Sequence, residues 1–264
     1  MSMRKSRVLK KLRSGEAASC VKLNLDNARV AEIAAAAGID CLWPDMEHVA
    51  NDWSLIEAQI LAAKAHDVDV MVRVARGSYS DAIKPLELDA TGIMVPHIMS
   101  LEDARSVIRM TRFHPVGRRP VDGGNADGGY GRIDAKEYIR QANEQRFLVL
   151  QIEDPEPLAE LDEIVSLPGL DIVFFGPLDF SQGLGAPGDF KHPKLLAARK
   201  RVAEAARKHG KFAGTTGSLR DIGEFMAMGY HFLSIGADVL GLGDYFHELA
   251  REFAKQVSSQ RRKP

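Results

Sequence analysis

Cysteine is scarce in this chain of 264 residues, which contains only Cys20 and Cys41. Two cysteines cannot build a disulfide framework, so their number favours a reducing compartment, and we expect a cytoplasmic protein. Long apolar runs are also missing, and no stretch of 18 or more apolar residues predicts a membrane span. The 35 Lys and Arg nearly balance the 36 Asp and Glu, which leaves a net charge of -1. Without a strong overall field, neither nucleic acid nor a membrane surface is an expected partner.

No linker rich in Pro, Gly or Ser divides the chain, and no internal sequence repeat occurs. The composition, 45% hydrophobic and 27% charged, is that of a globular protein. We therefore expect one domain over residues 1–264, with short basic extensions at both ends. The segment Met1–Arg13 lacks the apolar core of a signal peptide and predicts a solvated first helix.

Short apolar runs alternate with longer amphipathic stretches along the whole chain. Several of the short runs are apolar throughout, as strands of a parallel sheet covered by helices on both faces are. Eight such strands in 264 residues predict a (β/α)8 TIM barrel. A doubly wound open sheet is the alternative, and the lack of a G-x-G-x-x-G after the first strand disfavours its dinucleotide-binding form. The expected strands are Ser19–Leu23, Asp40–Pro44, Asp69–Val74, Gly92–Pro96, Phe147–Ile152, Asp171–Phe175, Phe212–Thr215 and His231–Ile235.

One connection is unusually long: Phe113–Asp134 carries six glycines and no clear helical or strand pattern. Loops of this length in a compact domain usually belong to an active site or are disordered. We expect one of these two outcomes here.

Polar residues gather where the expected strands end, which is the catalytic face of a barrel. Asp45, Arg73, Glu153 and Asp179 all lie at or just beyond such ends. Glu153 and Asp179 come from neighbouring strands, and a pair of carboxylates suits Mg²⁺ or Mn²⁺ with water and substrate as further ligands. The alternative is that each carboxylate only caps a helix.

Two further candidates have a functional and a structural interpretation. His48 has Asp45 and Glu47 close in sequence, and a carboxylate can hold an imidazole in the tautomer that accepts a proton. His48 could also simply hydrogen-bond within its loop. Arg73 follows an apolar run, so its guanidinium either clamps a substrate carboxylate or forms an internal ion pair. None of the expected strands ends in Lys, so a Schiff-base mechanism is not expected.

Several short motifs follow one another between residues 44 and 185. They are Pro44-Asp45-Met46-Glu47-His48, Met71-Val72-Arg73-Val74, Gly92-Ile93-Met94-Val95-Pro96, Gly117-Arg118-Arg119-Pro120, Gln151-Ile152-Glu153, Pro168-Gly169-Leu170-Asp171, Phe175-Gly176-Pro177-Leu178-Asp179-Phe180-Ser181 and Leu184-Gly185. In this order the motifs resemble the HpcH/HpaI family of class II, metal-dependent pyruvate aldolases, which includes 2-keto-3-deoxy-sugar-acid aldolases.

The resemblance implies a role for each motif residue. His48 matches the general base, and Arg73 matches the residue that stabilises the pyruvate enolate. Glu153 and Asp179 match the ligands of a divalent metal, with Mg²⁺ expected and Mn²⁺ or Co²⁺ as alternatives. Gln151 and the backbone at Leu178–Asp179 match substrate contacts. The implied reaction splits a 4-hydroxy-2-oxo acid into pyruvate, a 2-oxo acid, and an aldehyde.

The family places an acid, which supports the base, shortly before the strand that ends in Val-Pro, and Glu87 occupies that position here. Asp45 and Glu47 are the other candidates for the partner of His48. Because adjacent residues of an extended segment point to opposite sides, we expect Glu87 and Asp45 to share this task rather than Glu47.

The resemblance also implies assembly. The apolar C-terminal run Val239–Val257 is expected to pack on a neighbouring subunit of a homo-hexamer, although it could instead close its own barrel. Two other functions stay open: a citrate-lyase-like enzyme that cleaves coenzyme A thioesters, and a non-catalytic protein that binds 2-oxo acids.

Overall fold

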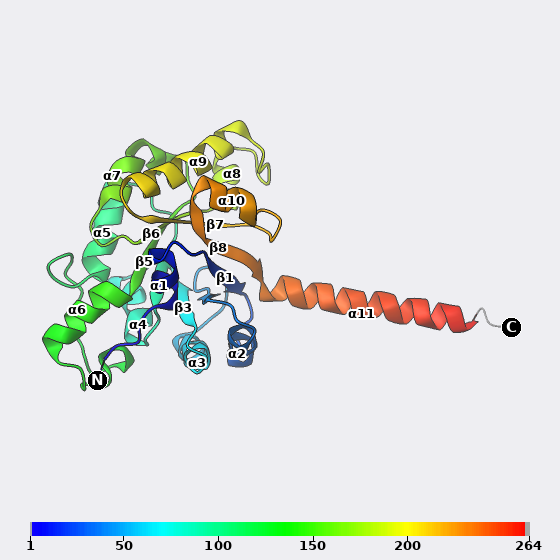
Figure 1. The fold of residues 1–264 in the computed structure, drawn as a ribbon, viewed down its shortest axis with the longest axis horizontal. Helices are drawn as coiled ribbons and strands as arrows, with labels where there is room; N and C mark the ends of the chain where they lie inside the picture. The colour runs from blue at the N-terminus through cyan, green and yellow to red at the C-terminus, as the bar shows by residue number, and fades with distance from the viewer. Residues whose placement is uncertain (1, 262–264) are drawn as a thin grey trace.

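Eight parallel strands close into a barrel in the computed structural model of the chain, which describes residues 2–261 (Figure 1). Each strand pairs with its neighbours in sequence, and β1 pairs with β8 to complete the ring. The predicted TIM barrel is confirmed. That residues 1–264 form one domain stays a prediction, and most of the C-terminal extension expected at residues 260–264 lies outside the described residues. The strands are β1 (Ala18–Leu23), β2 (Cys41–Pro44), β3 (Asp69–Arg73), β4 (Gly92–Val95), β5 (Phe147–Ile152), β6 (Ile172–Phe175), β7 (Phe212–Thr216) and β8 (Tyr230–Ala237).

Helices alternate with the strands and surround them (Figure 1). Helix α4 forms although Pro85 lies inside it, and Ser78 and Asp81 make a capping box at its start. None of the helices described is both long and apolar enough to cross a bilayer. The helices are α1 (Arg7–Arg13), α2 (Ala28–Ala36), α3 (Trp53–Lys64), α4 (Tyr79–Glu87), α5 (Leu101–Thr111), η1 (Ala126–Gly128), α6 (Ala135–Gln145), η2 (Glu156–Glu160), α7 (Leu161–Ser166), α8 (Pro177–Gly183), α9 (Pro193–Lys208), α10 (Ile222–Met228) and α11 (Asp238–Arg261).

The barrel interior is filled by large apolar side chains. Trp43, Met71, Phe147, Phe174 and Phe232 belong to one buried cluster, in which the aromatic rings meet edge to face. A second and larger cluster lies between the strands and the surrounding helices. Both faces of most strands are therefore buried, which explains their continuous apolar sequences.

The first helix is not solvated as the sequence predicts. Val8, Leu9 and Leu12 of α1 are buried and join the cluster inside the barrel. Helix α1 therefore closes the barrel at the end where the strands begin, and the functional rim lies at the opposite end.

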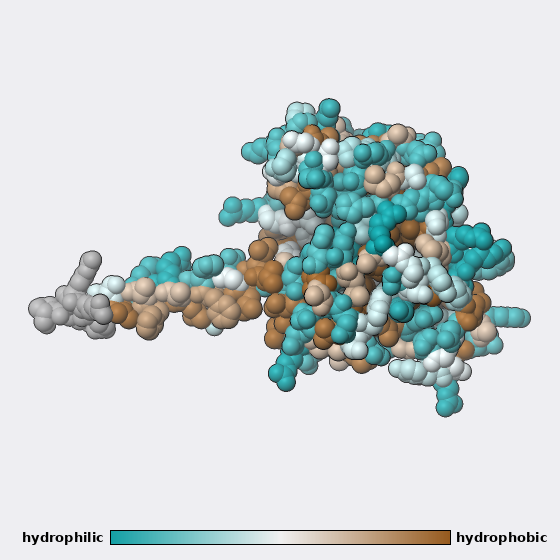
Figure 2. All heavy atoms as spheres, turned by 180° about the vertical axis from the view of Figure 1, so that it is seen from behind, coloured by the Kyte–Doolittle hydropathy of each residue, from teal (hydrophilic) through white to brown (hydrophobic). Residues whose placement is uncertain are grey.

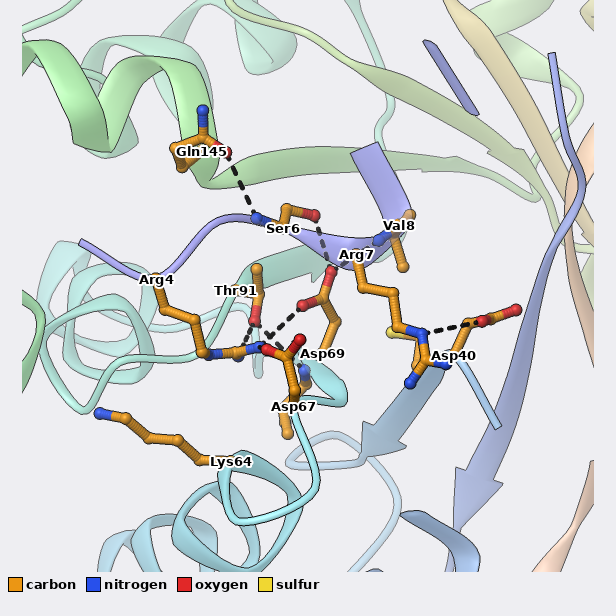
Figure 3. A network of polar contacts seen from close by, with 12 residues as sticks. Arg4, Ser6, Arg7, Val8, Asp40, Lys64, Asp67, Asp69, Thr91 and Gln145 are labelled. Carbon is orange, nitrogen blue, oxygen red and sulfur yellow. Dashed lines mark hydrogen bonds and ion pairs between the residues drawn. The ribbon is translucent and has the colours of Figure 1, made fainter. Parts of the chain in front are cut away.

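Asp69, the first residue of β3, holds the segment before α1 in place (Figure 3). Its buried carboxylate accepts hydrogen bonds from the Ser6 hydroxyl at 2.6 Å and from the Val8 amide at 2.9 Å. The Arg4 guanidinium adds an ion pair at 3.1 Å and also donates to the Thr91 hydroxyl. A buried charge with this many partners fixes the position of the segment.

The long connection between α5 and α6 is ordered and does not line the cavity at the rim. Its residues Arg119 and Asp127 form a buried ion pair at 2.8 Å, and the Tyr138 hydroxyl of α6 donates to the same carboxylate. Arg112, which follows α5, donates to the carbonyl of Arg146, the residue before β5. The connection therefore lies near the end of the barrel where the strands begin. Neither of the two expected outcomes therefore holds within a single chain.

Helix α11 leaves the barrel after β8 and extends away from it as a long arm (Figure 1). Apolar side chains cover much of the arm, which Figure 2 shows as a hydrophobic strip. The residues of this strip, all at least 37% exposed, are Val239, Leu240, Leu242, Tyr245, Phe246, Leu249, Phe253 and Val257. The arm does not close its own barrel.

We predict that Asp69→Asn destabilises the protein by about 2 kcal/mol or more, because Arg4 and two hydrogen-bond donors lose a buried anion. For a chain of this size the melting temperature should fall by roughly 5 °C in a thermal unfolding experiment. Asp67→Asn is the matched control, since Asp67 also pairs with the Arg4 guanidinium, at 3.6 Å, but its side chain is exposed. Equal effects of both changes would contradict the anchoring role of Asp69.

Candidate active site

A layer of mostly polar residues lies directly above the apolar interior of the barrel. Lys22, Arg73, Gln151 and Ser234 each stand two positions beyond a residue of the inner cluster, namely Cys20, Met71, Val149 and Phe232. Because side chains of a strand alternate between its faces, these residues point into the barrel mouth. They line a cavity of about 640 Å³ together with Trp43, His48, Gly176, Pro177, Leu178, Asp179, Thr216, Gly217, Gly236, Ala237 and Leu240.

Asp45 and Arg73 form a buried ion pair at the base of this cavity. The guanidinium Nε donates to Asp45 Oδ1 at 3.0 Å, and Nη2 donates to Oδ2 at 2.5 Å. Although burial favours the neutral acid, the hydrogen bonds and charges of Arg73 and Lys22 hold the pKa of Asp45 well below its usual value. The remaining guanidinium nitrogen, Nη1, lies 3.0 Å from a carboxylate oxygen of Glu47. Arg73 therefore has the internal partner of the structural interpretation while it also lines the cavity.

Glu153 is fully buried at the end of β5. The His97 amide donates to its Oε1 at 2.9 Å, and the Gln151 side-chain amide donates to its Oε2. Burial raises the pKa of Glu153 to about 7, with help from the nearby charges of Asp179 and Glu47 and against that of His97. Gly176 permits this packing, because a Cβ there would lie 2.7 Å from Glu153 Oε2.

Asp179 lies half-buried in the first turn of α8, beside the cavity. The start of α8 has no side-chain cap, and the start of η2 after Glu153 has none either. The capping interpretation therefore explains neither carboxylate.

The donor set at this end of the barrel fits a divalent cation. Four carboxylates, Asp45, Glu47, Glu153 and Asp179, face the two permanent cations Lys22 and Arg73. The four carboxylates exceed the two cations by two negative charges, which one divalent cation would neutralise. Within residues 2–261, no three or more His, Cys, Asp or Glu side chains are placed so that they could hold a metal ion together. A cation held by Glu153 and Asp179 would therefore complete its shell with water or substrate.

His48 is exposed at the mouth of the cavity, and Glu47 is the acid nearest to its ring. His48 Nε2 lies 3.5 Å from Glu47 Oε2. Asp45 pairs instead with Arg73 and Lys22. Glu87 ends α4, and the charges that act on its carboxyl are those of Arg119, Asp127 and Asp122. Within one chain, the structure brings Glu47 rather than Asp45 or Glu87 to the His48 ring, and the partnership of His48 with Asp45 and Glu87 stays a prediction.

His97 contributes to the site although the sequence gives it no role. Its backbone adopts a left-handed conformation with φ of 49°, and its amide points at Glu153. Its ring lies 2.8 Å from Asp154 and 3.6 Å from Glu47. Burial lowers the pKa of His97, but the bond to Asp154 and the charge of Glu153 raise it overall. The one sequence signal for His97 is its position just after β4.

Lys22, Trp43, Thr216 and Ser234 are further cavity residues that the motifs do not identify. Lys22 lies 2.8 Å from Asp45, and its ammonium stands 5.8 Å from the centre of the Trp43 ring. No strand ends in Lys, as expected, but Lys22, the penultimate residue of β1, still reaches the cavity.

We predict that Glu153→Gln stabilises the metal-free protein at pH 8. A carboxyl whose pKa rises on folding, from 4.5 to about 7 here, costs the folded state stability as pH rises through that window. In urea unfolding with EDTA, the wild type should be less stable at pH 8 than at pH 5, by on the order of 2 kcal/mol from this group. The variant should lack this part of the difference, whereas Glu156→Gln, an exposed control, should retain it. Parallel pH curves for wild type and Glu153→Gln would contradict the assignment.

The sequence and the fold both match known proteins. The sequence pattern of the HpcH/HpaI aldolase/citrate lyase family matches residues 19–242. The chain is 33% identical over 255 residues to a hydroxypyruvate/pyruvate aldolase of Pseudomonas aeruginosa, covering 96% of this chain and 94% of that one. It is 32% identical over 236 residues to a 2-keto-3-deoxy-L-rhamnonate aldolase of Escherichia coli K12, covering 89% and 88%. A crystal structure of an HpcH/HpaI aldolase from Desulfitobacterium hafniense DCB-2 superposes with a TM-score of 0.85 at 29% identity, covering 97% of each chain. The chain therefore belongs to the HpcH/HpaI aldolase/citrate lyase family.

Proposed function

We propose that the chain is a metal-dependent aldolase, which cleaves or forms a 4-hydroxy-2-oxo acid with pyruvate and an aldehyde as the other reactants. Its aldolase relatives indicate a carbon–carbon lyase. The observation that carries the proposal is the buried carboxylate of Glu153, which is close enough to Asp179 for their charges to act on each other, while Asp179, Arg73 and His48 line one cavity.

Glu153 and Asp179 would hold the divalent ion, Mg²⁺ in the first place and Mn²⁺ or Co²⁺ as alternatives. When bound, the ion supplies a Lewis acid that polarises the keto group of the substrate. Gln151, whose Oε1 is buried without a hydrogen-bond partner among the described residues, and the backbone at Leu178–Asp179 would orient the 2-oxo acid.

His48 acts as the base in this scheme. It takes the proton from the 4-hydroxyl, the C3–C4 bond breaks, and the bonding electrons move to the C2 oxygen as the enolate forms. Arg73 stabilises the negative charge that develops on that oxygen, because it is fixed in place before the reaction. Return of the proton to C3 releases pyruvate. Glu47, the acid nearest to the ring, is the group that orients His48 in a single chain.

We predict that the activity depends on a divalent ion. EDTA should abolish pyruvate release from 4-hydroxy-2-oxo acids, and Mg²⁺ or Mn²⁺ should restore it. Glu153→Gln and Asp179→Asn should each resemble the metal-free enzyme, while Asp154→Asn should be much milder. Full activity after rigorous chelation would refute the two-ligand assignment.

A screen of 4-hydroxy-2-oxo acids, followed by pyruvate release, tests the reaction itself. Exchange of pyruvate methyl protons in D₂O reports enolate formation without any aldehyde. A protein that shows neither exchange nor pyruvate release, but melts at a higher temperature with a coenzyme A ester and Mg²⁺, would be the thioester lyase instead.

We also propose that the chain forms a homo-hexamer through its α11 arm. A strip of eight apolar side chains on a helix that leaves its own barrel is a surface that a second copy of this chain would cover (Figure 2). A cytoplasmic location stays a prediction as well. It is supported by the scarcity of cysteine, since the chain has only Cys20 and Cys41.

The arm provides the test of assembly. Phe253→Glu should reduce the oligomer mass in light scattering, because it puts a charge into the apolar strip. Arg251→Glu, an equally exposed change on the same helix, should leave the mass unchanged. A monomeric wild type would refute the assembly.

A further inference from the structure

Lys22 reaches the base of the cavity from β1, on the side away from Glu153 and Asp179. Its ammonium lies 2.8 Å from Asp45 Oδ2, and 22% of its side chain is exposed. The ammonium and the Arg73 guanidinium both lie over the Trp43 ring, at 5.8 Å and 4.9 Å from its centre. Lys22 is therefore a fixed part of the cavity rather than a mobile surface lysine.

Two cations share one carboxylate oxygen at this point. Asp45 Oδ2 accepts from Arg73 Nη2 and also pairs with Lys22 Nζ. A pair of Arg73 and Asp45 alone has no net charge, so its field on a nearby anion would be weak. With Lys22 these three groups carry one net positive charge, and with Glu47, which lies 3.0 Å from Arg73 Nη1, the whole set is neutral. Without Lys22 the set would be anionic, and Asp45 and Glu47 together would outweigh the field of Arg73 on a bound substrate.

The charge of the whole cavity leads to the same conclusion. With Lys22 present, the carboxylates exceed the cations by two charges, which a divalent ion balances. Without Lys22 the excess would be three, and a metal-loaded site would remain anionic. A 2-oxo acid is itself an anion and gains a second negative charge at its oxygen during enolate formation. An anionic site would oppose both steps.

We propose that Lys22 is a positioning residue of the aldolase site, which offsets the charge of Asp45 so that the carboxylates around Arg73 do not outweigh its positive charge at the substrate. The proposal rests on the aldolase function proposed above. It assigns Lys22 no covalent role, because the ammonium is held as an ion pair by Asp45.

The test compares two equilibria that a charge effect moves in opposite directions. Lys22→Met removes the charge and keeps the length of the side chain over Trp43. The variant should bind pyruvate more weakly in the presence of Mg²⁺, and it should bind Mn²⁺ more tightly in the absence of pyruvate. We expect a change of about fivefold or more in each dissociation constant, the size of a unit-charge effect at an intermediate dielectric. Titration calorimetry measures both.

Lys84→Met is the matched control, because Lys84 also stands over a tryptophan ring, 5.2 Å from the centre of Trp53, on the outer helices α3 and α4. It should change neither constant. Lys22→Arg should restore much of the pyruvate affinity. Lys22→Gln, which retains a donor for Asp45 without the charge, should behave as Lys22→Met does, and it serves if the Met variant does not fold.

Weaker binding of both ligands by Lys22→Met and Lys22→Gln would reveal a structural role and overturn the proposal, as would unchanged constants. A pyruvate adduct on Lys22 after borohydride reduction would overturn it as well. The Mn²⁺ titration needs neither substrate nor turnover. It therefore tests Lys22 separately from the aldolase function, whose own failure would appear as a wild type without pyruvate proton exchange.

Discussion

The buried ion pair between Asp45 and Arg73 is the interaction on which the rest of the site depends. It joins the ends of β2 and β3, where the Met46 amide also donates to the Arg73 carbonyl at 2.9 Å and extends the parallel pairing beyond the strands. Two charges in a buried position are costly unless they are well paired, and removing one partner commonly costs about 3–5 kcal/mol. The bidentate geometry meets this condition. It also fixes the guanidinium before any substrate arrives, so no reorganisation is needed during the reaction.

The alternation of short apolar runs with amphipathic stretches was sufficient to predict the barrel and most polar residues at the C-terminal ends of its strands. The strand cores are apolar throughout because both faces are buried, and all eight fall within two residues of the expected bounds at their starts and ends. The rim positions of Asp45, Arg73, Glu153 and Asp179 follow from where those strands end. Family membership was likewise visible in the motif order and agrees with the relatives found.

The remaining features depend on contacts between distant parts of the chain. Glu87 stands at the sequence position of a family acid, yet the path of α4 takes it to Arg119 and Asp127. Lys22 was not predicted as a site residue, because the prediction considered only residues at or beyond the C-terminal ends of the strands, and Lys22 is the penultimate residue of β1. Alternation would have identified it, since Cys20 faces the barrel interior and Lys22 stands two positions later. The burial of α1 depends on Asp69, which lies more than sixty residues away from Ser6 and Val8.

The position of the polar layer explains why its charges occur in balanced sets. It rests on Trp43, Met71, Phe174 and their neighbours, which exclude water from below, and α1 closes the far end of the barrel. Charges next to this apolar layer are poorly screened from one another by water, so each needs a partner of opposite charge. Asp45 takes two cations, whereas Glu153 has the weak charge of His97 and the competing charge of Asp179. In the proposed reaction, Glu153 and Asp179 would hold the metal ion, and Arg73 and Lys22 would face the anionic substrate. The two sets of charges would then bind the two components of one metal-bound 2-oxo acid, which is why the proposed reaction needs both.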